Sequence, residues 1–177
     1  MHGFEKPDYL IDFSSLKISP NILQINQDSF SLSFNVLNTG KNNKDSINLK
    51  IENLSETGST LFSIKLNIQS PTYEDTIKVK LPILLGSEGK SKIFITIDEE
   101  DKIEELSENN NELIDGNGNK GFEIYVGSSE IKPTFPYQHS IYSGKEPLEL
   151  IATSRNPFNQ SSNYVIEIDT TAEFNSP

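Results

Sequence analysis

A strict alternation of apolar and polar residues between positions 29 and 37 constrains the fold of this chain more than any other feature. The apolar residues are Phe30, Leu32, Phe34 and Val36, and the polar residues are Ser29, Ser31, Ser33 and Asn35. Side chains along a β-strand point alternately to opposite faces, so the pattern predicts a strand with one face in a core and the other in water. Such a strand needs partners, because alone it leaves its backbone polar groups unpaired.

Further segments with the same period, separated by Gly, Pro, Ser and Thr, predict six more strands. They span residues 9–18, 47–51, 61–68, 76–81, 93–97 and 122–126. In the first of them the apolar period shifts by one step around Ser14 and Ser15, which predicts a bulge. Helical periodicity is weak everywhere, and the only candidate is a turn or two around 103–106. We therefore expect an all-β fold in which seven strands form one sandwich.

The composition changes after Val126, where prolines become frequent and only two or three further strands are indicated. We expect an N-terminal tail over 1–7, a β-sandwich over 8–126, a linker over 127–132, and the start of a second, truncated β-sandwich unit over 133–177. About fifty residues are too few for an independent sandwich. The alternative is that this last segment docks on the first domain and covers its edge strands.

The charge and the missing residue types exclude several classes of function. A formal net charge of −11 and a pI near 4.6 argue against binding to nucleic acid or anionic lipid, because clustered Lys and Arg capture such partners. The chain has no cysteine, so it has neither a disulfide nor a thiolate site. It has no signal peptide and no run of about eighteen apolar residues, so we expect no membrane insertion.

No group of residues in the sequence suggests catalysis. The two histidines, His2 and His139, lie far apart in the chain. The motifs of serine hydrolases and of nucleotide-binding loops do not occur. We therefore expect that the chain is not an enzyme, that it has no catalytic residue, and that it binds no cofactor.

The stretch Asp98 to Asn111, DEEDKIEELSENNN, directly follows the strand at 93–97 and has two possible roles. In the structural role, its carboxylates and amides accept hydrogen bonds from exposed backbone N–H groups, while Ile103 and Leu106 close the edge of the core. In the functional role, its hard oxygen ligands bind calcium. The candidate calcium ligands are Asp98, Asp101, Glu105 and Glu108, with Glu99 and Glu100 beside them. We favour the structural role because the spacing does not match an EF-hand loop.

The tripeptide Asn38-Thr39-Gly40 follows the strand that ends at Leu37. An asparagine side chain can bond to its own local backbone, and a glycine can adopt positive φ. We therefore expect an unstrained turn here, followed by a connection rich in Asn and Lys at 41–45.

These two segments together resemble the CARDB module, an immunoglobulin-like sandwich of seven strands found in bacterial and archaeal surface proteins. The matching residues are Asn38, Gly40, Asp98, Ile103, Glu105, Glu108, Asn110 and Asn111. The resemblance implies a seven-stranded immunoglobulin-like β-sandwich that binds a partner or spaces domains and does not catalyse a reaction. It also implies a place outside the cell or at the cell surface, as part of a larger exported protein.

A narrower resemblance rests on longer stretches. They are YEDT at 73–76, PIL at 82–84, residues 92–98, ELSENNN at 105–111, FPY at 135–137 and YVIEIDTTAEFNSP at 164–177. They look like one region of large Bacteroidetes surface proteins, which resemble gingipain-like cysteine peptidases and the sortase-like component of the type IX secretion system. The catalytic Cys and His of those proteins lie in a domain outside this chain, so no catalytic residue is carried over.

The residues and the resemblance together give one expected function and two alternatives. We expect a non-catalytic extracellular module that serves adhesion, partner recognition or domain spacing. The alternatives are an accessory domain of a gingipain-like peptidase and a calcium-stiffened adhesin repeat. The expected partners are a protein or glycan at the cell surface, or neighbouring domains of the same polypeptide. Strand edges and the loops 41–45 and 98–119 are the surfaces that would contact them.

Overall fold

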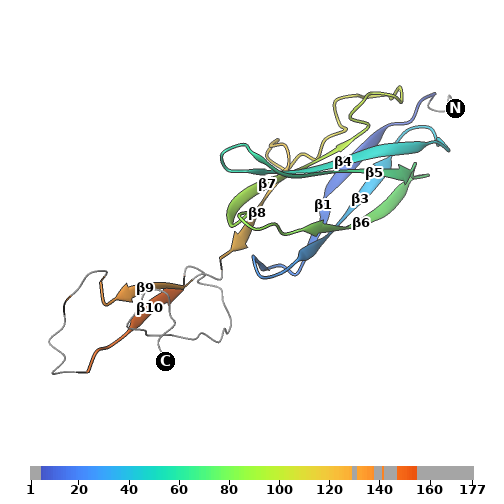
Figure 1. The fold of residues 1–177 in the computed structure, drawn as a ribbon. Coiled ribbons are helices and arrows are strands. Elements are labelled where there is room, and N and C mark those ends of the chain that lie inside the picture. The colour runs from blue at the N-terminus through green and yellow to red at the C-terminus, as the bar shows by residue number, and fades with distance from the viewer. Residues whose placement is uncertain (1–4, 129–130, 138–140, 142–146, 155–177) are drawn as a thin grey trace. The chain divides into compact units, whose positions relative to one another are not determined.

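The structure is a computed structural model that describes residues 5–128, 131–137, 141 and 147–154 (Figure 1). The chain divides into two compact units, Met1–Glu130 and Ile131–Pro177. Every regular element of the described residues is a β-strand. The all-β prediction is therefore confirmed.

The first unit is a sandwich of two sheets. Its strands are β1 (Tyr9–Ser19), β2 (Leu23–Gln24), β3 (Ser29–Asn38), β4 (Ser46–Ser55), β5 (Thr60–Gln69), β6 (Glu74–Pro82), β7 (Gly89–Ile97) and β8 (Phe122–Gly127). One sheet has the order β1-β3-β6 and the other has the order β2-β8-β7-β4-β5. The short β2 pairs in parallel with β8, and the other pairs of this unit are antiparallel. The seven longer strands are those that the apolar period predicts.

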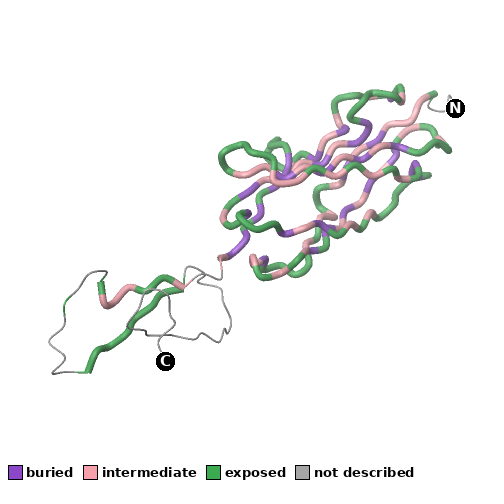
Figure 2. Tube along the Cα trace, viewed as in Figure 1, coloured by how far each residue is buried: buried purple, intermediate pink, exposed green. Residues whose placement is uncertain are grey.

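The core lies between the two sheets, where alternate residues of each strand point inward (Figure 2). In β3, Phe34 and Val36 are buried completely, whereas Ser31 on the opposite face is exposed. The five-stranded sheet contributes an equivalent layer, which is Ile47, Leu49 and Ile51 of β4 and Ile93, Ile95 and Ile97 of β7. Burying one such side chain contributes about 1.5–3 kcal/mol, so these two facing layers supply most of the stability of the unit.

The bulge expected in the first strand is present in β1. The pairing of β1 with β3 shifts register between Asp12 and Lys17. The Asp12 carboxylate accepts a hydrogen bond from the backbone N–H of Ser14 at 2.9 Å, and the hydroxyl of Ser15 accepts the N–H of Asn35 at 2.7 Å. Side chains thus replace ladder bonds that the extra residues interrupt.

The turn or two of helix expected around 103–106 is not formed. These residues belong to an irregular segment between β7 and β8. Two of their backbone N–H groups are accepted by carboxylates, and that of Leu106 is accepted by the distant carbonyl of Pro7, instead of by carbonyls one helical turn earlier. The N–H of Ile103 donates to Asp98 Oδ2 at 2.7 Å, and the N–H of Glu105 donates to Glu108 Oε1 at 2.8 Å. The dense acids compete with helix formation because they bond to their own local backbone.

The second unit contains an antiparallel pair, β9 (Ile131–Phe135) and β10 (Ile151–Ser154). The rings of Phe135 and Tyr137 meet edge to face, with their centroids 5.8 Å apart. The stretch at 164–177 that carried part of the narrower resemblance lies outside the described residues. The expected linker at 127–132 and the truncation of a second sandwich stay predictions.

Candidate functional site

Asp98 turns the chain out of β7 and into the acidic segment. Its φ of 47° lies in the left-handed region, which aspartate tolerates better than most residues. Its carboxylate accepts the N–H of Ile103, and its backbone N–H donates to the carbonyl of Asn48 at 2.8 Å. The side chain is buried. Asp98 therefore closes a local loop and holds it to β4.

Glu105 ties the acidic segment to the start of β1. Its Oε2 accepts the backbone N–H of Tyr9 at 2.6 Å, and its Oε1 accepts the side-chain amide of Asn111 at 2.9 Å. Only 4% of Glu105 is exposed, and Tyr9 is buried completely. The hydroxyl of Tyr9 lies 2.6 Å from that of Ser70. Both the backbone N–H and the side-chain hydroxyl of this first residue of β1 are therefore hydrogen-bonded.

The surroundings of Glu105 raise the pKa of its carboxyl from 4.5 to about 7. Burial is the main cause, because removal from water disfavours the charged form. The donors from Tyr9 and Asn111 oppose this effect, while the nearby carboxylates of Glu108 and Asp98 add to it. At neutral pH the carboxyl is therefore close to half protonated.

Three further bonds join the acidic segment to residues just before β1. The side-chain amide of Asn110 donates to Asp8 Oδ1 at 3.0 Å, and the N–H of Leu106 donates to the carbonyl of Pro7 at 2.9 Å. Lys6 forms an exposed ion pair with Glu104. Sequence reasoning missed this role of residues 6 and 7, which it placed in an N-terminal tail, because nothing local marks them.

Asn38 uses its whole side-chain amide at the turn after β3. Its Oδ1 accepts the N–H groups of Asp8 and Gly40, at 3.2 and 3.0 Å. Its Nδ2 donates to the carbonyls of Lys41 and Pro71, at 3.1 and 3.2 Å. Asn38 thus joins the N-terminal residues, the 41–45 loop and the β5–β6 connection at one end of the sandwich. We call this end, with the acidic segment 98–111, the clamp.

Gly40 is required for a different reason from the one expected. It is not among the glycines with positive φ. A Cβ at this position would lie 2.4 Å from the carbonyl oxygen of Lys6 and 2.7 Å from the carbonyl carbon of Pro7. The freedom to adopt positive φ, on which the expected turn rested, is therefore not used at Gly40, and the glycine is needed because two backbone segments approach closely.

The expected closing of the core edge by Ile103 and Leu106 is half correct. Ile103 is partly buried and packs against the core, whereas 46% of Leu106 is exposed. Leu113 is the residue that is buried completely, with its N–H bonded to the carbonyl of Ile95 at 2.9 Å. Sequence reasoning missed Leu113 because it is a single apolar residue in an irregular stretch, without a period to mark it.

The calcium candidates Asp98, Asp101, Glu105 and Glu108 do not converge on one point. Within the described residues, no group of three or more Asp, Glu or His is placed to hold a metal ion. Three of the four carboxylates accept backbone N–H groups instead. The neighbouring acids Glu99 and Glu100 pair with lysines, and these bonds lower the pKa values of both carboxyls. The expectation that the chain binds no metal stays a prediction, with calcium as its alternative.

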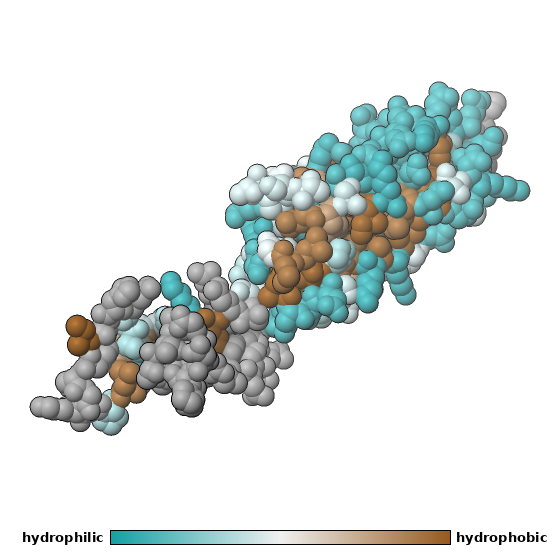
Figure 3. All heavy atoms as spheres, viewed as in Figure 1, coloured by the Kyte–Doolittle hydropathy of each residue, from teal (hydrophilic) through white to brown (hydrophobic). Residues whose placement is uncertain are grey.

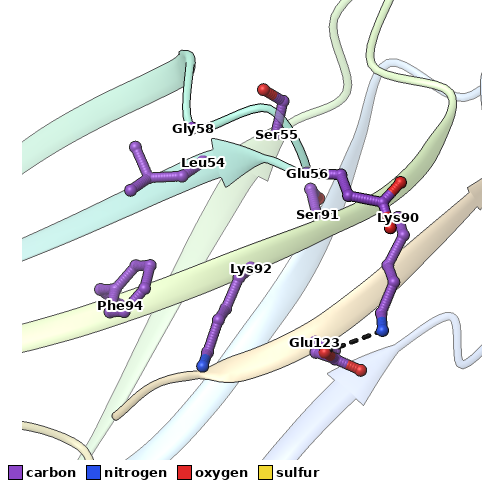
Figure 4. Close-up of a pocket in the computed structure, with 9 residues that line it drawn as sticks. All are labelled: Leu54, Ser55, Glu56, Gly58, Lys90, Ser91, Lys92, Phe94 and Glu123. Atoms are coloured by element: carbon purple, nitrogen blue, oxygen red, sulfur yellow. Dashed lines mark ion pairs between the residues drawn. The ribbon is translucent and has the colours of Figure 1, made fainter.

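A shallow pocket of about 360 Å³ opens near the β4–β5 hairpin of the five-stranded sheet (Figure 4). Its apolar lining comes from Leu54 and Phe94, which pack only partly into the protein. Lys92 Nζ lies 5.5 Å from the centroid of the Phe94 ring, within the range of a cation–π contact. The volume falls at the lower end of the range for small-ligand sites.

The charged rim of the pocket is balanced. Two lysines, Lys90 and Lys92, and two glutamates, Glu56 and Glu123, line it. Lys90 Nζ lies 2.9 Å from Glu123 Oε1, and this bond raises the pKa of Lys90. Donors and acceptors thus alternate around an apolar surface without a net charge, which suits a neutral polar ligand.

The described residues contain no helix that is long and apolar enough to cross a membrane. They form strands, irregular segments and the clamp described above, and the carboxylates of that clamp accept hydrogen bonds.

Comparisons with known proteins found one matching family model and several solved structures of similar fold. A family model described as CARDB matches residues 6–115. The CARDB domain of a Pyrococcus furiosus protein, crystallised in complex with di-metal ions, is 24% identical, with 71% of this chain and 97% of that chain covered and a TM-score of 0.49. A domain, residues 272–376, of a candidate cell surface protein from Methanosarcina acetivorans is 14% identical, with 77% and 99% covered and a TM-score of 0.45. No curated protein matches the chain.

Proposed function

The chain belongs to the CARDB family, and from this premise we propose that it is an adhesion or recognition module of a larger extracellular surface protein. The family is related to cell adhesion and is not catalytic. The proposal adds that the module lies outside the cell and that it contacts a protein or glycan there. The clamp is the single observation that carries the proposal, because it supports a module that withstands tension between a cell and its contact.

The clamp fixes the point where the chain enters the sandwich. Tyr9 pairs with Asn38 at the start of β1, and Glu105, in the irregular segment between β7 and β8, accepts the backbone N–H of the same residue. The chain leaves the sandwich at the other end, where Val126 pairs with Leu23. A pull on the two chain ends therefore acts along the strands, and the clamp resists separation of β1. A module that resists such a pull could serve as a spacer between a cell and the surface to which it adheres.

The pocket between Leu54 and Phe94 is the surface that we propose for recognition. A neutral sugar ring has one apolar face and hydroxyls that both donate and accept, which fits a balanced rim around an aromatic side chain. The test is an NMR titration of the purified chain with a panel of neutral and anionic oligosaccharides. Shifts confined to residues 54–58 and 90–94 would support the proposal, and Phe94→Ala should abolish them. Tyr125→Ala, a change of an exposed aromatic residue outside the pocket lining, is the control.

A replacement experiment in cells tests the module as a whole. In the parent gene, residues 6–127 are deleted or are exchanged for an unrelated β-sandwich of the same length, and adhesion of intact cells is measured. Loss on deletion with recovery on exchange supports spacing, and loss in both supports recognition. Unchanged adhesion in both strains would contradict the proposed function. Protease treatment of intact cells checks that the module is exposed.

We further propose that the parent protein is of the Bacteroidetes type that resembles gingipain-like peptidases and the type IX secretion sortase-like component. The support within the first unit is the set of matching stretches at 73–76, 82–84, 92–98 and 105–111. The gene upstream of this segment tests the proposal. A domain with a catalytic Cys and His would support it, and a parent built from sandwich modules alone would oppose it.

A further inference from the structure

β6 is a regular strand with one open edge. It pairs with β3 over nine consecutive residues without a register shift, and within the described residues it has no strand on its other side. The opposite edge of the same sheet, β1, is interrupted by the bulge at 13–16. Bulges are one means by which proteins prevent the pairing of edges, and β6 lacks that protection.

Apolar side chains on the core-facing side of β6 stay partly exposed near this edge. Ile77 and Val79 are only partly buried against the core, as are Phe62, Ile64, Leu66 and Ile68 of β5, the edge strand of the other sheet. In Figure 3 a band of hydrophobic atoms covers the part of the first unit where Figure 1 draws β5 and β6. A strand added to β6 would cover part of this band.

The charges of β6 are divided along its length. Glu74 and Asp75 lie at its start, while Lys78 and Lys80 lie towards its end. All four are exposed, and none has an ion pair within the described residues. On the outer face of the other sheet, Lys50, Lys65 and Lys90 are each paired with glutamates. β6 therefore has acids at one end and lysines at the other, none of them in an ion pair within the described residues. A second β6 in antiparallel orientation would place lysines opposite acids.

We propose that β6 is a homotypic docking edge, to which β6 of a second copy of this chain adds in antiparallel orientation. With Ile77 opposite Ile77 of the second copy, Glu74 lies opposite Lys80 of that copy, and Lys80 lies opposite Glu74. The two three-stranded sheets become one six-stranded sheet about a two-fold axis, as a self-complementary interface requires.

The register follows from charge. Pairing centred on Lys78 would use the whole strand but would place Lys78 opposite its own copy, which is unfavourable. Pairing centred on Ile77 overlaps residues 74–80 and forms two Glu–Lys contacts on the outer face. The same shift places Thr76 opposite Lys78. Asp75 falls opposite Val79 at the rim and adds no ion pair. The register centred on Ile77 therefore combines the most overlap with complementary charge.

β5, the other long edge, lacks this complementarity. Its only charged residue is Lys65, so self-pairing would form no contact between opposite charges. Lys65 is also held by Glu99 and Glu100 of the acidic segment, with nitrogen–oxygen distances of 2.9 and 3.3 Å. The contact is thus specific to β6. It extends the proposed adhesive role to contact between identical molecules, but it does not depend on that role.

Sedimentation equilibrium of the purified full chain over a wide concentration range at physiological salt tests the proposal. We expect a reversible monomer–dimer equilibrium. Glu74→Lys and Lys80→Glu should each weaken dimerisation about tenfold or more, because two attractive pairs become repulsive. An equimolar mixture of the two variants should recover it as a heterodimer. The double variant E74K/K80E should recover it as a homodimer with the original net charge.

Lys17→Glu is the matched control, because it changes the net charge by the same amount as Lys80→Glu on the same face of the sheet. It lies on β1, away from the open edge, and should leave the dimer constant unchanged. Circular dichroism of each variant confirms the fold, since both substituted positions on β6 are exposed. A monomer at all concentrations overturns the proposal. So does a dimer whose constant responds equally to K17E and K80E, or one that the charge exchange does not restore.

Discussion

The carboxylate of Glu105 accepts the backbone N–H of Tyr9 at 2.6 Å, although the two residues are 96 positions apart in the sequence. Both residues are buried, and a third partner, Asn111, bonds to the other oxygen of the carboxylate. This one side chain joins the first strand, which lies in one sheet, to the irregular segment between β7 and β8 of the other sheet. The clamp, and the stability of the fold at different pH values, depend on its protonation state.

Stability should decrease as the pH rises from about 4.5 to about 7. The pKa of the Glu105 carboxyl is about 7 in the folded state, against 4.5 for its ordinary value. In this window the folded state holds a proton that the unfolded state has released, so the free energy of unfolding falls with pH, by about 2–3 kcal/mol between pH 5 and pH 8. Glu99, Glu100 and Asp115 have lowered pKa values and titrate below the window. Urea unfolding at several pH values measures the slope.

Glu105→Gln should remove most of this pH dependence, because the amide does not titrate. Its carbonyl can still accept from Tyr9, and its NH₂ can donate to Asn111 Oδ1, which is buried without a partner among the described residues, once that amide rotates. Glu104→Gln is the control, since the Glu104 side chain is 79% exposed. An equal slope in the Glu105→Gln and Glu104→Gln variants would show that Glu105 is not the responsible group.

Leu113→Ala should destabilise the sandwich by about 2–5 kcal/mol, because it leaves a cavity in a closely packed core. Leu113 is buried completely, whereas 46% of Leu106 is exposed. Leu106→Ala removes the same atoms from the same irregular segment and should cost less than about 1 kcal/mol. Thermal or urea unfolding of the two variants makes the comparison. Equal losses would contradict the assignment of Leu113 as the core residue.

Gly40→Ala should destabilise the fold by about 1–3 kcal/mol, because its methyl group would overlap the backbone of Lys6 and Pro7. Gly116→Ala provides the contrast. Gly116 has no positive φ, and nothing lies within 4 Å of a Cβ placed there. That substitution should be neutral or slightly stabilising, because it reduces the entropy of the unfolded chain. Denaturant midpoints measured in parallel distinguish the two, and a harmless Gly40→Ala would refute the close-approach argument.

Calcium should leave the melting temperature unchanged. The carboxylates of Asp98, Glu105 and Glu108 accept backbone N–H groups, so binding an ion would require these bonds to be broken. The measurement is thermal unfolding in excess EDTA and then in millimolar Ca²⁺, followed by the near-UV signal of the tyrosines. A rise of several degrees with Ca²⁺ would show that the folded state binds the ion and would favour the calcium-stiffened adhesin repeat.

Local patterns predicted the elements well where each strand has one buried face. The alternation from 29 to 37 gave β3, and the shifted period around Ser14 gave the bulge in β1. Reasoning of this kind failed at 103–106. The weak helical period there does not give a helix, because carboxylates accept local backbone N–H groups. It also missed Leu113, because a single apolar residue has no period. Residue chemistry predicted that Asn38 and Glu105 bond to the backbone, but not that they reach Asp8 and Tyr9.

The sequence by itself determined the all-β class, the succession of strands along the chain and the absence of cysteine chemistry, because these depend on periodicity and residue type alone. Only the tertiary structure decided which distant groups meet. It paired Glu105 with Tyr9, pressed Gly40 against the backbone of Lys6, and left β6 with an open edge. Such contacts join residues tens of positions apart, and their geometry is fixed by how two sheets pack, which no local pattern encodes.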